Sequence, residues 1–149
     1  YKQNEHYKKL IGKFGEDLVI PVSAKIECEL AQLPQEEAQE FMQDLEITES
    51  GLDNVIRHTH ENLNLITFFT CGPKEIHAWS VKKGTTIVDA AGEIHTDLQH
   101  GFICAEIYNC ADILKEGSEQ ALKNAGKIRT EGRDYIVKDG DIVLIRFNV

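Results

Sequence analysis

The sequence predicts a mixed α+β protein, with helices in its first part and a β-sheet in its second. Three observations carry this prediction. Apolar residues recur at helical spacing before residue 64, runs rich in β-branched and aromatic residues begin at Leu65, and an Asp-Gly pair near the carboxyl end is typical of a β-hairpin. The change of pattern near Leu65 predicts two parts, residues 1–64 and residues 65–149.

The first part is predicted to be mostly helical. Apolar stripes predict helices over residues 7–14, 24–33, 35–45 and 51–63. One short apolar run, Leu18–Val22, has the length of a strand, and Pro21 places it at a strand end or a sheet edge. Helix, strand and helix in this order are typical of an α/β sheet.

The second part alternates strands with helices. Strands are predicted over 65–71, 75–81 and 102–108, helices over 86–94 and 118–125, and a final hairpin with strands 135–137 and 141–147 around Asp139-Gly140. Hairpin, helix, strand, helix and hairpin form the element order of a β-grasp fold, in which a mixed sheet embraces one helix. The sequence therefore predicts a β-grasp domain over residues 65–149.

The stretch AAGEIHTDLQHGFICAEI, residues 90–107, resembles the signature of the TGS domain in YchF-type Obg-like ATPases. Long runs elsewhere resemble the same family: VIPVSAKIECEL at 19–30, GLDNVIRHTHENLNLITFFTCGPKEIHAWSV at 51–81 and EGRDYIVKDGDIVLIRFNV at 131–149. The resemblance implies a ubiquitin-like β-grasp TGS domain at 65–149, preceded by the α/β tail of a P-loop NTPase domain and its helices at 1–64. It also implies a cytoplasmic parent that binds and hydrolyses ATP or GTP with Mg²⁺ and associates with ribosomes or RNA.

The residues that hold nucleotide phosphates are missing from this sequence. Gly12-Lys13 is followed by Phe14, and Tyr7 stands where a P-loop has its first glycine. The chain begins without Met inside a helical pattern, so we expect it to be a piece of a longer protein whose amino-terminal part carries the P-loop. We expect no ATP or GTP hydrolysis by this chain alone.

A polar loop follows the short run that ends at Val22. The resemblance implies that Ser23, Ala24 and Lys25 contact the nucleotide base in the intact parent. Backbone N–H groups at the start of a helix have no partner within the helix and can face a ligand. The alternative is an ordinary loop between a strand and a helix.

The chain is acidic, with a net charge of −9. Residues 1–64 contain 6 Lys and Arg against 13 Asp and Glu, giving −7, and residues 65–149 contain 10 against 12, giving −2. Nucleic-acid affinity depends on neutralising phosphates, so any RNA contact needs a local basic patch. Candidates are Lys74, His77, Lys82 and Lys83 beside Trp79, and a second run of Lys127, Arg129 and Arg133. The alternative is solvated surface charge, with Trp79 packed in the core.

Other site chemistry receives little support from the sequence. No Gly-x-Ser-x-Gly motif is present, and His95 near Asp97 is more typical of a histidine bonded within its own loop than of a catalytic base. The four cysteines lack zinc-ligand spacing, which predicts thiols in a reducing compartment and no metal site. No run is long enough to span a membrane. Two alternatives to the NTPase parent are a stand-alone RNA-binding TGS protein and a β-grasp module that binds another protein.

Overall fold

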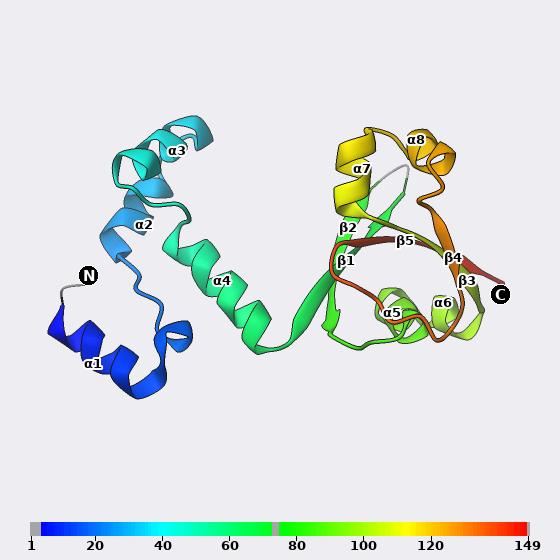
Figure 1. The fold of residues 1–149 in the computed structure, drawn as a ribbon, viewed down its shortest axis with the longest axis horizontal. Helices are drawn as coiled ribbons and strands as arrows, with labels where there is room; N and C mark the ends of the chain where they lie inside the picture. The colour runs from blue at the N-terminus through cyan, green and yellow to red at the C-terminus, as the bar shows by residue number, and fades with distance from the viewer. Residues whose placement is uncertain (1–3, 73–74, 149) are drawn as a thin grey trace. The chain divides into compact units, whose positions relative to one another are not determined.

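The computed structural model describes residues 4–72 and 75–148, which divide into two compact units, Tyr1–Asn62 and Leu63–Val149 (Figure 1). The first unit is helical. Its elements are α1 (Glu5–Phe14), the 3₁₀ helix η1 (Glu16–Leu18), α2 (Ala24–Leu30), α3 (Gln35–Asp44) and α4 (Gly51–Asn62).

The predicted strand at Leu18–Val22 is wrong. Leu18 ends η1, and residues 19–23 join no strand ladder within the described part of the chain. Pro21 lacks the N–H that a ladder would use, and residues 4–62 include no strand that could lie beside this run. The run therefore serves as an irregular connection into α2.

Side-chain hydrogen bonds at the start of α4 cap this helix and connect it to α2. The Ser50 hydroxyl accepts a hydrogen bond from the Asp53 N–H at 3.0 Å and so caps α4. The Glu27 carboxylate, on α2, accepts from the Gly51 N–H at 2.8 Å. A negative charge at a helix amino terminus also interacts favourably with the helix dipole, so Glu27 joins α2 to the start of α4.

The described residues of the first unit include no buried side chain. Several large apolar side chains are instead exposed: Leu10, Phe14, Leu18, Val22, Leu45, Leu52, Val55 and Ile56. The helices are amphipathic, but within this chain their apolar faces are only partly covered.

The second unit is a mixed α+β structure, which confirms the predicted fold class. Its elements are β1 (Leu65–Cys71), β2 (Ile76–Lys82), α5 (Ile87–Ile94), α6 (Thr96–His100), β3 (Phe102–Asn109), α7 (Cys110–Glu116), α8 (Glu119–Asn124), β4 (Arg129–Glu131) and β5 (Asp141–Phe147). The five strands form one sheet in the order β2-β1-β5-β3-β4. β1 and β5 are parallel, and the other neighbours are antiparallel.

Helices pack on both faces of this sheet (Figure 1). On one face, Phe68, Ile107 and Val143 from the strands pack with Ile87 and other residues of α5 in the larger buried cluster. On the other face, Tyr108 and Ile142 pack with Leu122 of α8. Side chains alternate between the two faces along β1, β3 and β5, so these three strands contribute to both cores.

The predicted carboxyl-terminal hairpin is wrong. Ile136 forms a single bridge with Thr86, and β5 lies between β1 and β3. The Asp139 carboxylate accepts from the Thr67 N–H at 2.8 Å, so the Asp-Gly turn directs the chain into the centre of the sheet. The short elements α6, α7 and β4 lie outside the sequence prediction because each is too short for a clear periodic pattern.

Candidate nucleic-acid interface and nucleotide-facing loop

The loop Ser23-Ala24-Lys25 begins α2. The Ser23 hydroxyl accepts from the Ile26 N–H at 3.5 Å, and Ser23 thereby caps the helix. Among the described residues, the N–H groups of Ala24 and Lys25 have no acceptor, and both residues are exposed. These two adjacent N–H groups can donate hydrogen bonds to an acceptor outside the chain.

Ser23 also lines a cavity of about 560 Å³, which is formed by α2, the segment before α4 and α4 itself. The cavity mixes apolar side chains, such as Ile26 and Ile47, with Glu49 and Arg57. Arg57 donates to the two oxygens of Glu49 at 2.9 and 3.2 Å, and this hydrogen-bonded pair lowers the pKa of Glu49. Arg57 also pairs with Glu61, so its charge is already matched by carboxylates.

The first predicted basic patch does not form a single surface. Residues alternate between the two faces of β2, so His77 and Trp79 lie on one face and Lys82 lies on the other. The His77 ring lies 4.2 Å from the Trp79 ring, and the Trp79 indole N–H donates to Thr70 at 3.0 Å. Lys74 lies outside the described residues.

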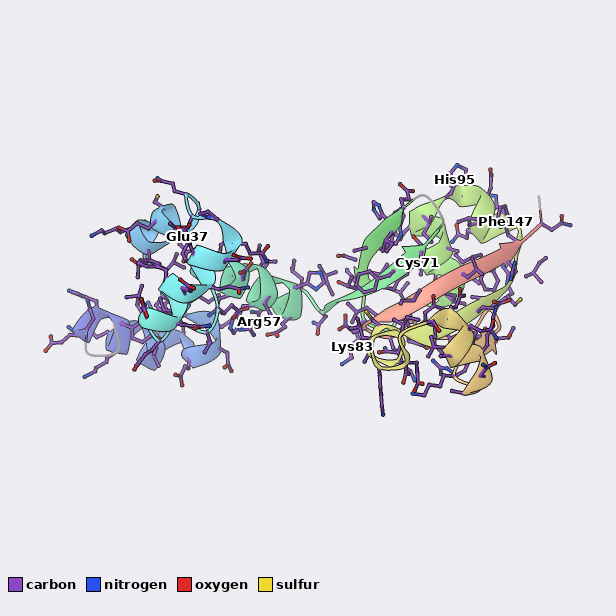
Figure 2. All side chains as sticks on the ribbon, turned by 90° about the horizontal axis from the view of Figure 1, so that it is seen from above. Glu37, Arg57, Cys71, Lys83, His95 and Phe147 are labelled. Carbon is purple, nitrogen blue, oxygen red and sulfur yellow. The ribbon has the colours of Figure 1, made fainter. Side chains whose placement is uncertain are left out.

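Lys82 and Lys83 are adjacent, and both are exposed. Within residues 4–72 and 75–148, neither ammonium group has a carboxylate oxygen within 4.0 Å. Figure 2 shows Lys83 at one end of the β1–β2 hairpin and Cys71 toward the other. These two lysines are therefore available to an outside anion.

The second predicted basic run is engaged inside the molecule. Lys127 pairs with Asp112 at 2.7 Å and with Glu116 at 3.1 Å, and these hydrogen bonds raise its pKa. Arg129 pairs with Glu131 and donates to the Tyr135 hydroxyl. These contacts reduce the positive potential that Lys127 and Arg129 offer to a phosphate.

Arg133 completes the second run and is also held by the protein. It donates to the Phe102 carbonyl at 3.0 Å and lies over the Phe102 ring. The sequence shows the charges of this run but not their partners. Those of Lys127 lie on α7, which was not predicted, and those of Arg129 and Arg133 depend on the fold.

The remaining candidates for chemistry are local features. The Nδ1 atom of His95 accepts from the Asp97 N–H at 3.1 Å, so His95 caps α6. The four cysteines are thiols, and the described residues include no cluster suited to a metal ion. None of the helices that the structure describes is long and apolar enough to cross a membrane.

Comparison with known proteins assigns this arrangement to a family. Residues 65–148 match the family model YchF-GTPase_C, which carries the description "Protein of unknown function (DUF933)". The chain belongs to the YchF family. The resemblance seen at residues 90–107 is thereby confirmed at the level of the family.

Relatives in the YchF family are known from bacteria and eukaryotes. The "Ribosome-binding ATPase YchF" of Escherichia coli O157:H7 is 46% identical over 145 residues, which cover 97% of this chain and 40% of the relative. "Obg-like ATPase 1" of Pongo abelii is 47% identical over 131 residues, covering 88% of this chain and 33% of the relative. This chain thus spans at most 40% of the length of these two relatives.

A solved YchF structure has the same arrangement of elements. The YchF GTPase of Schizosaccharomyces pombe matches with a TM-score of 0.83 and 37% sequence identity. The match covers 93% of this chain and 37% of that one. The YchF fold therefore extends over both units described above.

Proposed function

We propose that this chain is the carboxyl-terminal part of a YchF-type ribosome-binding ATPase, and that residues 65–149 are a TGS domain of the β-grasp type. The sheet order β2-β1-β5-β3-β4, with α5 packed across one face, supports the β-grasp assignment. Relatives that are named ribosome-binding ATPases support the ribosomal role. In this proposal the second unit is a binding or regulatory module.

The nucleotide is bound mainly by the amino-terminal part of the longer, cytoplasmic protein, which supplies the P-loop and holds ATP or GTP with Mg²⁺. Ser23, Ala24 and Lys25 contact the base from this chain through the exposed N–H groups at the start of α2. The amino-terminal part also covers the apolar faces of α1 and α4, where Phe14 and Ile56 are about half exposed.

Ribosomal RNA is contacted through Lys82 and Lys83. One observation carries this assignment. The ammonium groups of Lys82 and Lys83 are exposed and have no carboxylate nearby among the described residues, whereas the ammonium group of Lys127 forms ion pairs with two carboxylates. Contacts with phosphate weaken as salt rises, because binding releases counterions from the nucleic acid.

Co-sedimentation of the chain with ribosomes over a series of salt concentrations tests this contact. The variant K82E/K83E is expected to lose about tenfold or more in affinity at low salt and to show a shallower salt dependence. The variant K115E/K123E is the matched control, since it changes the net charge equally at two exposed lysines of α7 and α8. Equal losses in both variants, or binding that is insensitive to salt, would contradict the proposal.

A second candidate function is binding of a partner protein. It is favoured by one observation, the exposed outer edge of β2. Salt-insensitive association with a protein would support it over RNA binding.

A further inference from the structure

The two outer edges of the sheet are built differently. β4 has three residues, and such a short strand offers little to pair with. β2 has seven residues and follows β1 in continuous register from Ile76 to Lys82. β2 contains neither proline nor a bulge, which are devices that natural proteins use to protect a sheet edge.

The ladder shows which backbone groups of β2 point outward. The Lys83 N–H donates to the Asn64 carbonyl at 2.8 Å, and the Gly72 N–H donates to the Glu75 carbonyl at 2.9 Å. Hydrogen-bonded pairs alternate with non-bonded pairs along an antiparallel ladder. The backbone N–H and C=O groups of the odd-numbered residues of β2 therefore point toward β1. Ile76 and Ala78 therefore direct their N–H and C=O groups away from the sheet, with no acceptor or donor among the described residues.

The side chains beside these groups are suited to a neighbouring strand. Ile76 is 74% exposed although it is β-branched and apolar, and Ala78 is exposed on the same face. On the other face, Trp79 packs partly into the larger core and leaves the rest of its ring at the edge. Lys82 and Lys83 add two positive charges at the end of the strand.

We propose that β2 accepts an extended, acidic segment of a partner protein as an additional strand of the sheet. Backbone groups of Ile76 and Ala78 form the ladder. Alternating apolar side chains of the segment cover Ile76 on one face, and the side chains between them lie beside Trp79 on the other face. Carboxylates of the segment lie beside Lys82 and Lys83, because these lysines have no acidic partner within the described chain. Strand addition of this kind takes affinity from main-chain hydrogen bonds and specificity from side chains.

This inference goes beyond the proposed ribosomal role. An RNA contact uses the lysine side chains, whereas strand addition also requires the outward N–H of Ala78. The two ideas can therefore fail separately.

The test uses the 149-residue chain and a fluorescent peptide of sequence VTVTVEE. Fluorescence anisotropy measures binding, and hydrogen exchange measures protection of the Ala78 amide in the complex. One control peptide carries N-methyl groups at alternate residues and cannot form a ladder, and another, VTVTVKK, reverses the charge. Saturable binding with slowed exchange at Ala78 is expected, and both control peptides are expected to bind at least about tenfold more weakly.

The variant A78P removes one outward N–H and leaves the ladder to β1 intact, because proline is tolerated on the outer side of an edge strand. It is expected to weaken peptide binding about tenfold while ribosome co-sedimentation stays unchanged. K82E/K83E is expected to weaken peptide binding, and K115E/K123E is the matched control. Circular dichroism checks that each variant is folded.

Several outcomes would overturn the proposal. Equal binding of the N-methylated peptide shows that no ladder forms, and this result does not depend on any variant folding. Binding of VTVTVKK as tight as that of VTVTVEE shows that Lys82 and Lys83 do not recognise the acidic residues of the peptide. A concentration-dependent dimer that A78P abolishes, without peptide binding, assigns the edge to a second copy of the chain.

Discussion

At the residue scale, one buried carboxylate organises the approach to β5. Asp141 is 1% exposed, and its Oδ2 atom accepts from the Tyr135 hydroxyl at 2.8 Å and from the Lys138 N–H at 2.9 Å. D141A leaves both donors without this acceptor, so we expect a loss of about 2–3 kcal/mol in the free energy of unfolding. Y135F removes one of the two bonds and is expected to cost about 1 kcal/mol. Urea unfolding measures both, and equal small losses would contradict the assigned role.

Tyr135 also makes the free energy of unfolding depend on pH in the alkaline range. Burial, followed by the hydrogen bond to Asp141, raises the pKa of Tyr135, and burial raises the pKa of Tyr108 as well. The folded state holds these protons more tightly, so their contribution is complete below about pH 10 and is lost as pH rises through the raised values. We expect the free energy of unfolding to fall as pH rises above about 10, and to fall less in Y135F. A slope identical in Y135F and the parent chain would contradict this prediction.

The candidate site was partly predictable from single residues. Lys82 and Lys83 are visible in the sequence as adjacent charges, and the structure leaves both exposed. The state of Lys127 was not predictable, because Asp112 and Glu116 become its partners only when α7 forms. Likewise, His77 and Lys82 lie on opposite faces of the sheet because both belong to β2, and their nearness in the sequence does not show this.

At the element scale, the start of β3 is held against the carboxyl-terminal segment. The Asn148 N–H donates to the Gly101 carbonyl at 2.9 Å, and a Cβ atom added at Gly101 would overlap the Asn148 carbonyl oxygen. G101A is therefore expected to displace this segment and lower the free energy of unfolding by about 1–3 kcal/mol.

G132A is the matched control for this prediction, because a Cβ atom at Gly132 meets nothing within 4 Å. We expect this variant to stay within about 0.5 kcal/mol of the parent chain in urea unfolding. A loss in G132A that equals the loss in G101A would mean that the contact with Asn148 is not the cause.

Elements with a strong local pattern were the predictable ones. β1, α5 and β3 lie close to their predicted bounds, since alternation or helical spacing marks each of them. The carboxyl-terminal hairpin failed because its Asp-Gly turn bonds to Thr67 of β1, which is distant in sequence. A local turn signal cannot show which strand the chain joins next.

At the scale of the whole molecule, the two units differ in how far each buries its own apolar surface. The second unit encloses Phe68, Ile87 and Ala105 completely, whereas the described residues of the first unit include no buried side chain. Burial of apolar surface is the main favourable contribution to folding. The first unit is therefore expected to be less stable by itself than the second.

This difference predicts two levels of amide hydrogen exchange. Amides of Phe68, Ile107 and Val143 are expected to exchange only on unfolding of the second unit, with opening free energies of about 5 kcal/mol or more. Amides of α1 and α4 are expected to open at about 1–2 kcal/mol, because few apolar contacts are lost when these helices fray. In the full-length protein the amides of α4 should slow markedly if the amino-terminal part covers Ile56. Equal protection of α4 and β3 in the 149-residue chain would show that the first unit is stable by itself.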